Sequence, residues 1–194
     1  MGYATVEQLR EYLGITGTTD DGLLYRLLKS AEEYIEKDRG YSFEVSSDTT
    51  RYFTVGVDTD GAILNFDAWC AAITTVTNNA DGTTETITST YYTTLPRNIG
   101  PYHGIKLKSS SNYSWTYSSD PEGGISVAGK WGWSTTPPDD IKQCCIRLAG
   151  YYYRQKDAGV FDTTAIPDAG VIQVPQGVPR DVRIILDNYP RGFA

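Results

Sequence analysis

The alternation of apolar and polar positions predicts helices at the start of the chain. Thr5 and Gln8 have the spacing of a capping box, and Leu9 and Leu13 share one face of the helix that follows. We expect this first helix to end near Gly14, because glycine readily adopts the left-handed conformation that closes a helix.

A second helix is expected to begin at Asp20 and Asp21, whose carboxylates suit the positive end of a helix dipole. It should run to Arg39 and stop at Gly40. Its apolar residues recur at helical spacing: Leu23, Leu24, Leu27, Leu28, Ala31, Tyr34 and Ile35.

Helical periodicity returns after the prolines at 137 and 138, with Asp139 and Asp140 in the first turn. The apolar stripe of this third helix, which should end near Ala158, contains Ile141, Cys144, Cys145, Leu148, Ala149 and Tyr152. A short fourth helix is expected after Val178 and should be ended by Pro190. Residues 1–45 and 138–194 therefore predict a four-helix, mainly antiparallel bundle.

Residues 46–137 are rich in Thr, Ser, Tyr, Gly and Trp and contain short β-prone runs. The expected strands are 51–55, 72–77, 105–107, 113–117 and 125–133. The pair Asp81-Gly82 predicts a tight hairpin turn between two Thr-rich runs. The predicted fold class is α+β, a helical bundle with an inserted antiparallel β-rich module.

The segment 157–177 is too apolar for a solvated linker, and a loop of this length inside a compact domain is usually functional. We expect it to be buried against a partner, for example as an added strand. Its candidate contact residues are Phe161, Ile166, Val171, Ile172 and Val174.

The charge of the chain argues against a protein whose main task is to hold nucleic acid. The formal net charge is -7, whereas duplex binding depends on cations that neutralise phosphates. Residues 1–45 carry 5 basic and 9 acidic groups, residues 46–137 carry 5 and 8, and residues 138–194 carry 7 and 7, so no segment forms a basic patch by sequence.

Candidate chemistry is sparse, and we expect no enzyme, no cofactor and no metal. The single histidine, His103, lies in a Pro- and Gly-rich turn without the neighbours of a catalytic triad. Asp58, Asp60 and Asp67 could serve glycoside chemistry only if two of them met across a cleft, and turns are rich in Asp for backbone reasons. We expect them to be structural.

The aromatic residues of the middle segment leave a binding role open. They are Tyr91, Tyr92, Tyr113, Trp115, Tyr117, Trp131 and Trp133, accompanied by Lys106, Lys108 and Lys130. We expect most of them to build the β core, with carbohydrate or protein contact as the other interpretation.

Compartment and membrane signals are weak. The three cysteines do not have the spacing of a disulfide framework or a metal site. No stretch approaches the roughly 20 apolar residues that a membrane span needs, and the start carries charges where a signal peptide would be apolar. We expect a protein made in a reducing cytoplasm, without a membrane partner.

Four segments together resemble the head-tail connector, or adaptor, family of tailed bacteriophages. They are Tyr3 to Gly14, Asp20 to Phe43, the helix start at Pro138 to Gln143, and Val178 to Arg191. Each is unspecific alone, but their order matches, and they cover roughly the first 45 and the last 57 residues.

The resemblance implies a structural subunit whose copies form a ring, dodecameric in the family, between the portal and a stopper or tail-completion protein. Such a ring extends the channel through which DNA passes without being tightly bound. It further implies a place at the head-tail interface of the virion, after assembly in the host cytoplasm. Tyr189, Arg191 and Phe193 are the candidate portal-docking residues.

The β-rich insertion replaces a much shorter connection in the simplest members of the family, and we expect it on the outer flank of the ring. The alternative function is a carbohydrate- or receptor-binding β module on a helical stalk.

Overall fold

The computed structural model describes residues 2–158, 164–166, 170–172 and 177–193. The chain divides into two compact units. The helical unit contains Met1–Gly40 and Pro137–Arg191, and the β unit contains Tyr41–Thr136 with Gly192–Ala194.

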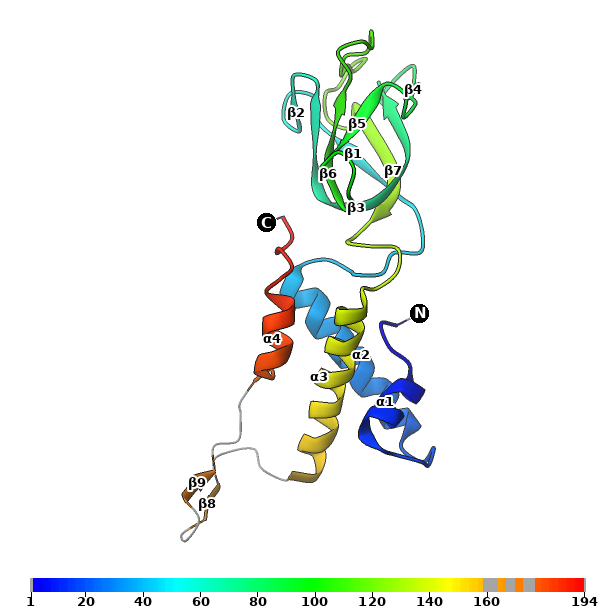
Figure 1. Ribbon diagram of the computed structural model, residues 1–194. Helices are drawn as coiled ribbons and strands as arrows, with labels where there is room; N and C mark the ends of the chain where they lie inside the picture. The colour runs from blue at the N-terminus through cyan, green and yellow to red at the C-terminus, as the bar shows by residue number, and fades with distance from the viewer. Residues whose placement is uncertain (1, 159–163, 167–169, 173–176, 194) are drawn as a thin grey trace. The chain divides into compact units, whose positions relative to one another are not determined.

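The described part of the helical unit contains four helices: α1 (Val6–Leu13), α2 (Asp21–Arg39), α3 (Asp139–Ala158) and α4 (Arg180–Leu186). Helices α2 and α3 pack along each other, α1 contacts both, and α4 lies against α3 (Figure 1). The unit is therefore built from the two ends of the chain.

The helix ends follow local sequence signals, as predicted. The backbone N–H of Gln8 donates to the Thr5 hydroxyl at 3.2 Å, and the Thr5 N–H donates to the Gln8 side chain at 2.9 Å, which completes the capping box. Gly14 and Gly40 close α1 and α2 with φ of 72° and 82°, a region that favours glycine.

The sequence suggested that α4 would be ended by Pro190. In the structure the helix already ends at Leu186. The residues after it form a turn, in which the N–H of Tyr189 donates to the Leu186 carbonyl at 2.9 Å. The side chain of Arg39, at the end of α2, donates hydrogen bonds to backbone carbonyls at this end of α4.

The core of the helical unit consists of the predicted apolar stripes. Its buried residues include Leu9, Leu24, Leu28, Ala31, Ile35, Ile141, Cys144, Cys145, Leu148, Ala149, Val182 and Leu186. Helices from both chain ends therefore bury their apolar faces against one another.

The β unit is one seven-stranded sheet in which every pairing is antiparallel. Its strands are β1 (Thr49–Phe53), β2 (Thr59–Asp60), β3 (Ile63–Asn78), β4 (Glu85–Ile87), β5 (Tyr92–Leu95), β6 (Tyr102–Leu107) and β7 (Ile125–Trp131). The main strand order is β1-β7-β3-β6-β5. The class of the protein is therefore α+β, as predicted.

The long strand β3 bends the sheet around its own core. Its first half pairs with β6 and its second half with β7, with register shifts between Asn65 and Cys70 and between Ile73 and Thr75. Irregularities of this kind increase local twist. The enclosed side chains include Phe53, Leu64, Phe66, Ile87, Tyr92, Ile105, Leu107, Trp115, Ile125 and Val127, and the curvature is visible in Figure 1.

One strand and one turn predicted for the β unit were wrong. Residues 113–117 form no strand; instead the buried side chain of Asn78 donates to the Ser114 carbonyl at 2.9 Å and accepts from the Thr116 N–H at 3.0 Å. The β3–β4 connection is the loop 79–84 and not a tight turn at Asp81-Gly82, since Asn78 is the last residue of β3 to pair with β4.

The segment 157–177, predicted as one irregular loop, contains a two-stranded hairpin. Strand β8 (Thr164–Ile166) pairs antiparallel with β9 (Gly170–Ile172). These two strands form a sheet separate from that of the β unit.

Candidate interaction sites

A buried arginine fixes the end of α4 in the helical unit. Arg39 is only 3% exposed, and its guanidinium donates to the carbonyl oxygens of Leu186 at 2.9 Å and of Tyr189 at 2.8 Å. The last carbonyls of a helix lack partners within the helix, so an arginine there satisfies them and meets the negative end of the dipole.

Asp38 joins this arrangement from the same turn of α2. Its carboxylate accepts hydrogen bonds from Arg39 Nε and from Arg183, both at 2.8 Å, and Arg183 also donates to the Tyr34 hydroxyl at 2.8 Å. Burial by itself would raise the pKa of Asp38, but the hydrogen bonds from Arg183 and Arg39 hold it below its ordinary value. The carboxylate is therefore kept ionised.

The three candidate docking residues of the tail have different surroundings. Tyr189 donates from its hydroxyl to the Asp140 carboxylate, at 2.7 and 2.9 Å to the two oxygens. Arg191 is exposed. Phe193, which belongs to the β unit, is 48% exposed and its ring lies 4.9 Å from that of Trp69. Arg191 and Phe193 thus present more surface than Tyr189.

The candidate partner-contact loop is described only in part. Phe161 and Val174 lie outside the described residues. Ile166 ends β8, and Val171 and Ile172 lie in β9, where the backbone of Ile172 faces Thr164. The hairpin supplies a backbone for contact, and the role of its side chains stays a prediction.

The aspartates considered for catalysis have structural partners. Asp58 accepts the backbone N–H of Thr54 at 2.6 Å within its own turn, and Asp67 pairs with Arg51 at 2.8 Å. Asp60 faces Ile63 in the β2–β3 ladder. His103 packs edge-on against Trp69, with ring centroids 6.2 Å apart. Within the described residues, no group of three His, Cys, Asp or Glu side chains could hold a metal ion.

The aromatic residues separate into core and surface groups. Trp131 packs on Phe53 and Phe66 and donates from its indole to the Thr49 carbonyl at 2.9 Å, and Trp115 is buried. Trp133 stacks on Tyr41, with centroids 5.4 Å apart. These rings stabilise the β unit. Surface tyrosines such as Tyr91 (41% exposed) are the ones available to a ligand.

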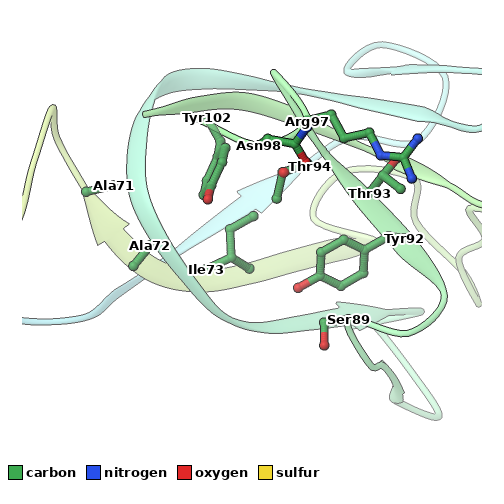
Figure 2. A pocket seen from close by; sticks show the side chains of 10 residues that line it. All are labelled: Ala71, Ala72, Ile73, Ser89, Tyr92, Thr93, Thr94, Arg97, Asn98 and Tyr102. Carbon is green, nitrogen blue, oxygen red and sulfur yellow. The ribbon is translucent and has the colours of Figure 1, made fainter. Parts of the chain in front are cut away.

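A groove of about 440 Å³ lies between β3 and β5 of the β unit. Figure 2 shows the rings of Tyr92 and Tyr102 approaching Ile73 from either side, while Arg97 reaches away from the cavity. Among the described strands, β5 pairs only with β6, and its residues Tyr92, Thr93 and Thr94 line this groove.

Two further hollows adjoin each other on the β unit, sharing Ser110 and Tyr113. The first, of about 400 Å³, is polar and includes Asn78, Glu85, Tyr91 and Asn112. The second, of about 570 Å³, includes Arg97, Lys106, Lys108 and three consecutive serines from Ser109. No sequence pattern singles out Arg97. The alternate spacing of Lys106 and Lys108 on a strand was the available signal that both side chains face outward.

None of the described helices is long and apolar enough to cross a membrane.

The geometry defines an α+β protein whose helical unit comes from both chain ends and whose antiparallel β unit is inserted between them. A sequence model of the HCP, or head completion protein, family matches residues 3–192, so the chain belongs to this family. The resemblance to phage head-completion adaptors inferred from the sequence is thereby confirmed. The family places the chain among structural proteins of virions.

Solved structures with a similar fold come from gene transfer agent (GTA) particles. A chain in the neck of an empty GTA particle computed with C6 symmetry is 17% identical, with a TM-score of 0.57, over 96% of this chain and 88% of that one. A chain in the neck of a native GTA particle computed with C12 symmetry is 19% identical, with a TM-score of 0.50, over 90% and 92%.

A chain in the virion of the native GTA particle gives 16% identity and a TM-score of 0.54, over 96% of this chain and 88% of that one. A search of curated protein sequences finds no significant match.

Proposed function

We propose that the protein is an adaptor subunit of a phage-like virion neck. Copies of it form a ring, a dodecamer, between the portal and a stopper or tail-completion protein, and the ring extends the DNA channel. The observation that carries this proposal is the match of the head completion protein family to nearly the whole chain. The neck particles with related folds, solved with C6 and C12 symmetry, support a cyclic assembly.

The helices supply the rigid part of such a ring. We infer that α1 to α4 act as an antiparallel bundle making the subunit contacts, and that the β unit lies on the outer flank, where its mass does not block the channel. A density map with the β unit inside the lumen would contradict this placement.

Portal docking is assigned to the tail. The Arg39 network holds the chain as far as Tyr189, so the residues beyond it leave from a fixed point. We infer that Arg191 and Phe193, both exposed, make the main contacts and that Tyr189 sets their direction. The hairpin segment with Phe161, Ile166, Val171, Ile172 and Val174 is the proposed contact to a neighbouring protein.

DNA is expected to pass without tight binding. A net charge of -7 repels phosphates, so the purified protein should not retard duplex DNA at physiological salt. Assembly in the host cytoplasm precedes incorporation into the virion. No catalytic step is part of this role.

Negative-stain microscopy of the protein alone and mixed with its portal tests the proposal. Closed rings with a central hole, in either sample, are the expected result. Persistent monomers in both samples would contradict the adaptor role.

A double variant, Arg191→Ala with Phe193→Ala, should abolish capture by the portal while circular dichroism stays unchanged. Lys130→Ala is the control, because Lys130 is a cation of the β unit whose ammonium donates to the Ser46 carbonyl at 3.2 Å. Equal capture of the double variant and the control would refute docking through the tail.

A further inference from the structure

The outer face of the β5–β6 ladder gathers most of the positive charge of the β unit. Residues 46–137 contain 5 basic side chains, and three of them, Arg97, Lys106 and Lys108, line the hollow of about 570 Å³. No carboxylate is among the described residues that line it. The cations are therefore concentrated in a unit that is acidic as a whole.

Strand pairing explains why these side chains point the same way. Tyr92 faces Leu107 and both are buried, whereas Thr93 faces Lys106 in the next row. The Lys108 N–H donates to the Tyr91 carbonyl at 2.8 Å, which extends the ladder by one row. Because side chains alternate between faces, Tyr91, Lys106 and Lys108 share the outer face.

These cations remain available to a ligand. In the described part of the chain, Arg97 and Lys106 have no ion pair, and Lys106 is exposed. Lys108 uses one N–H to bind the Thr90 carbonyl at 2.6 Å. An ammonium has three donors, so two remain.

The adjoining hollow has a different chemistry. Tyr91 and Tyr113 meet edge to face, with centroids 5.0 Å apart, at its wall. Glu85 offers carboxylate oxygens, and Asn112 is an exposed amide that can donate and accept. This side of the site therefore suits a ligand that brings hydroxyl donors and an apolar face for a tyrosine ring.

We propose that the two hollows form one site for an acidic saccharide. A sugar ring packs against Tyr113 and gives hydroxyl hydrogen bonds to Glu85 and Asn112, while the carboxylate of a uronic or similar acidic sugar binds Lys106, Lys108 and Arg97. The shared residues Ser110 and Tyr113 join the two parts.

The position of Glu85 favours a saccharide over other anions. A phosphate backbone and an acidic peptide offer Glu85 no hydroxyl-rich ring, so neither brings the hydroxyl donors that its carboxylate can accept. A saccharide supplies donors to Glu85 and a charge to the lysines at the same time. The site adds a surface-binding activity to the proposed neck role and does not depend on it.

Titration of the purified full-length protein with tetragalacturonate, followed by NMR of backbone amides, tests the proposal. We expect shifts to concentrate at residues 85, 91, 106–113 and to weaken with added salt. The fully methyl-esterified tetramer, which lacks the charge, should bind about tenfold more weakly, because charge-assisted hydrogen bonds are the stronger ones. A poly-glutamate peptide and a short DNA duplex are the comparison ligands.

Variants separate the two parts of the site. Lys106→Gln, at an exposed position that should not affect folding, and Tyr113→Ala should each weaken tetragalacturonate binding by about tenfold. Lys130→Gln and Tyr52→Ala are matched controls from the same unit, outside both hollows. They should change the affinity for tetragalacturonate by less than about twofold.

Absence of shifts at these amides would overturn the proposal. Equal binding of poly-glutamate or DNA, without an effect of Tyr113→Ala, would also overturn it, because the surface would then be a general anion surface. Ring formation on the portal is measured separately, so the failure of one proposal is distinguishable from the failure of the other.

Discussion

The buried guanidinium of Arg39 donates a hydrogen bond of 2.9 Å to the backbone carbonyl of Leu186, and so ties the end of α2 to the end of α4. These two residues are 147 positions apart in sequence. Through this bond and the one to Tyr189, the first half of the helical unit determines where the C-terminal tail leaves it.

Replacing Arg39 by methionine should lower the free energy of unfolding by about 3 kcal/mol, since the Leu186 and Tyr189 carbonyls lose the guanidinium donor and Asp38 loses a partner. Urea denaturation measures the loss, and carboxypeptidase digestion should remove the tail faster. Lys37→Met, an exposed change in the same helix turn, is the control and should cost less than about 0.5 kcal/mol. Equal stability of the two variants would contradict the role assigned to Arg39.

Asp81 makes the stability of the β unit depend on pH. The backbone N–H groups of Asp120, Ser119 and Ser118 donate to its carboxylate and hold its pKa below the ordinary value. Because its pKa is lower in the folded than in the unfolded chain, the ionised Asp81 stabilises the fold at pH values above the unfolded pKa of about 4. This contribution is lost as the pH falls from about 4 through the lower pKa of the folded state.

Asp81→Asn should therefore lower the Tm at pH 7, and the difference from the wild type should shrink as the pH falls below about 4. Differential scanning calorimetry at several pH values measures the Tm of the variant and of the wild type, and so the change of their difference with pH. Asp60→Asn removes another exposed carboxylate of the β unit and serves as the control. A difference for Asp81→Asn that stays constant with pH would refute the explanation.

The three cysteines should be inert in the folded protein. Burial raises the pKa of Cys70, Cys144 and Cys145 to about 12, so near pH 8 their thiolate fraction is about a thousandfold below that of a thiol with an ordinary pKa. Ellman's reagent should react with fewer than one thiol per chain in native buffer and with all three in guanidinium.

Ser109→Cys, which places a thiol at an exposed position, should add one rapidly reacting group. Rapid native reaction of the wild type would show that the cysteines are accessible.

Two glycine substitutions should have opposite effects. A Cβ at Gly129 would lie 2.5 Å from the Ala72 carbonyl oxygen and 3.2 Å from the Cys70 sulfur, so Gly129→Ala should cost about 2 kcal/mol. A Cβ at Gly22, in α2, meets nothing within 4 Å. Gly22→Ala should therefore stabilise the protein by about 0.5 to 1 kcal/mol, through helix propensity and a less flexible unfolded chain.

Urea denaturation of both variants checks the pair. A stable Gly129→Ala protein would mean that β3 and β7 can separate without cost at this row.

The β unit shows where sequence reasoning failed. The apolar run predicted as strand 72–77 is the second half of β3, which begins at Ile63 because its first half pairs with β6. Residues 113–117 alternate like a strand but stay unpaired, since the amide of Asn78 satisfies their backbone. In both cases the deciding partner lies far away in the sequence.

The sequence by itself determined the helices and the places where α1, α2 and α3 stop. Capping at Thr5, the glycines at 14 and 40, and the apolar stripe of α3 act within a few residues, and helical hydrogen bonds join positions four apart. Only the tertiary structure decided the strand order and the hydrogen bond from Arg39 to the Tyr189 carbonyl. It also decided that Arg97, Lys106 and Lys108 line the same hollow. Strand pairing and side-chain contacts depend on which distant segments are packed together, and local periodicity carries no information about that choice.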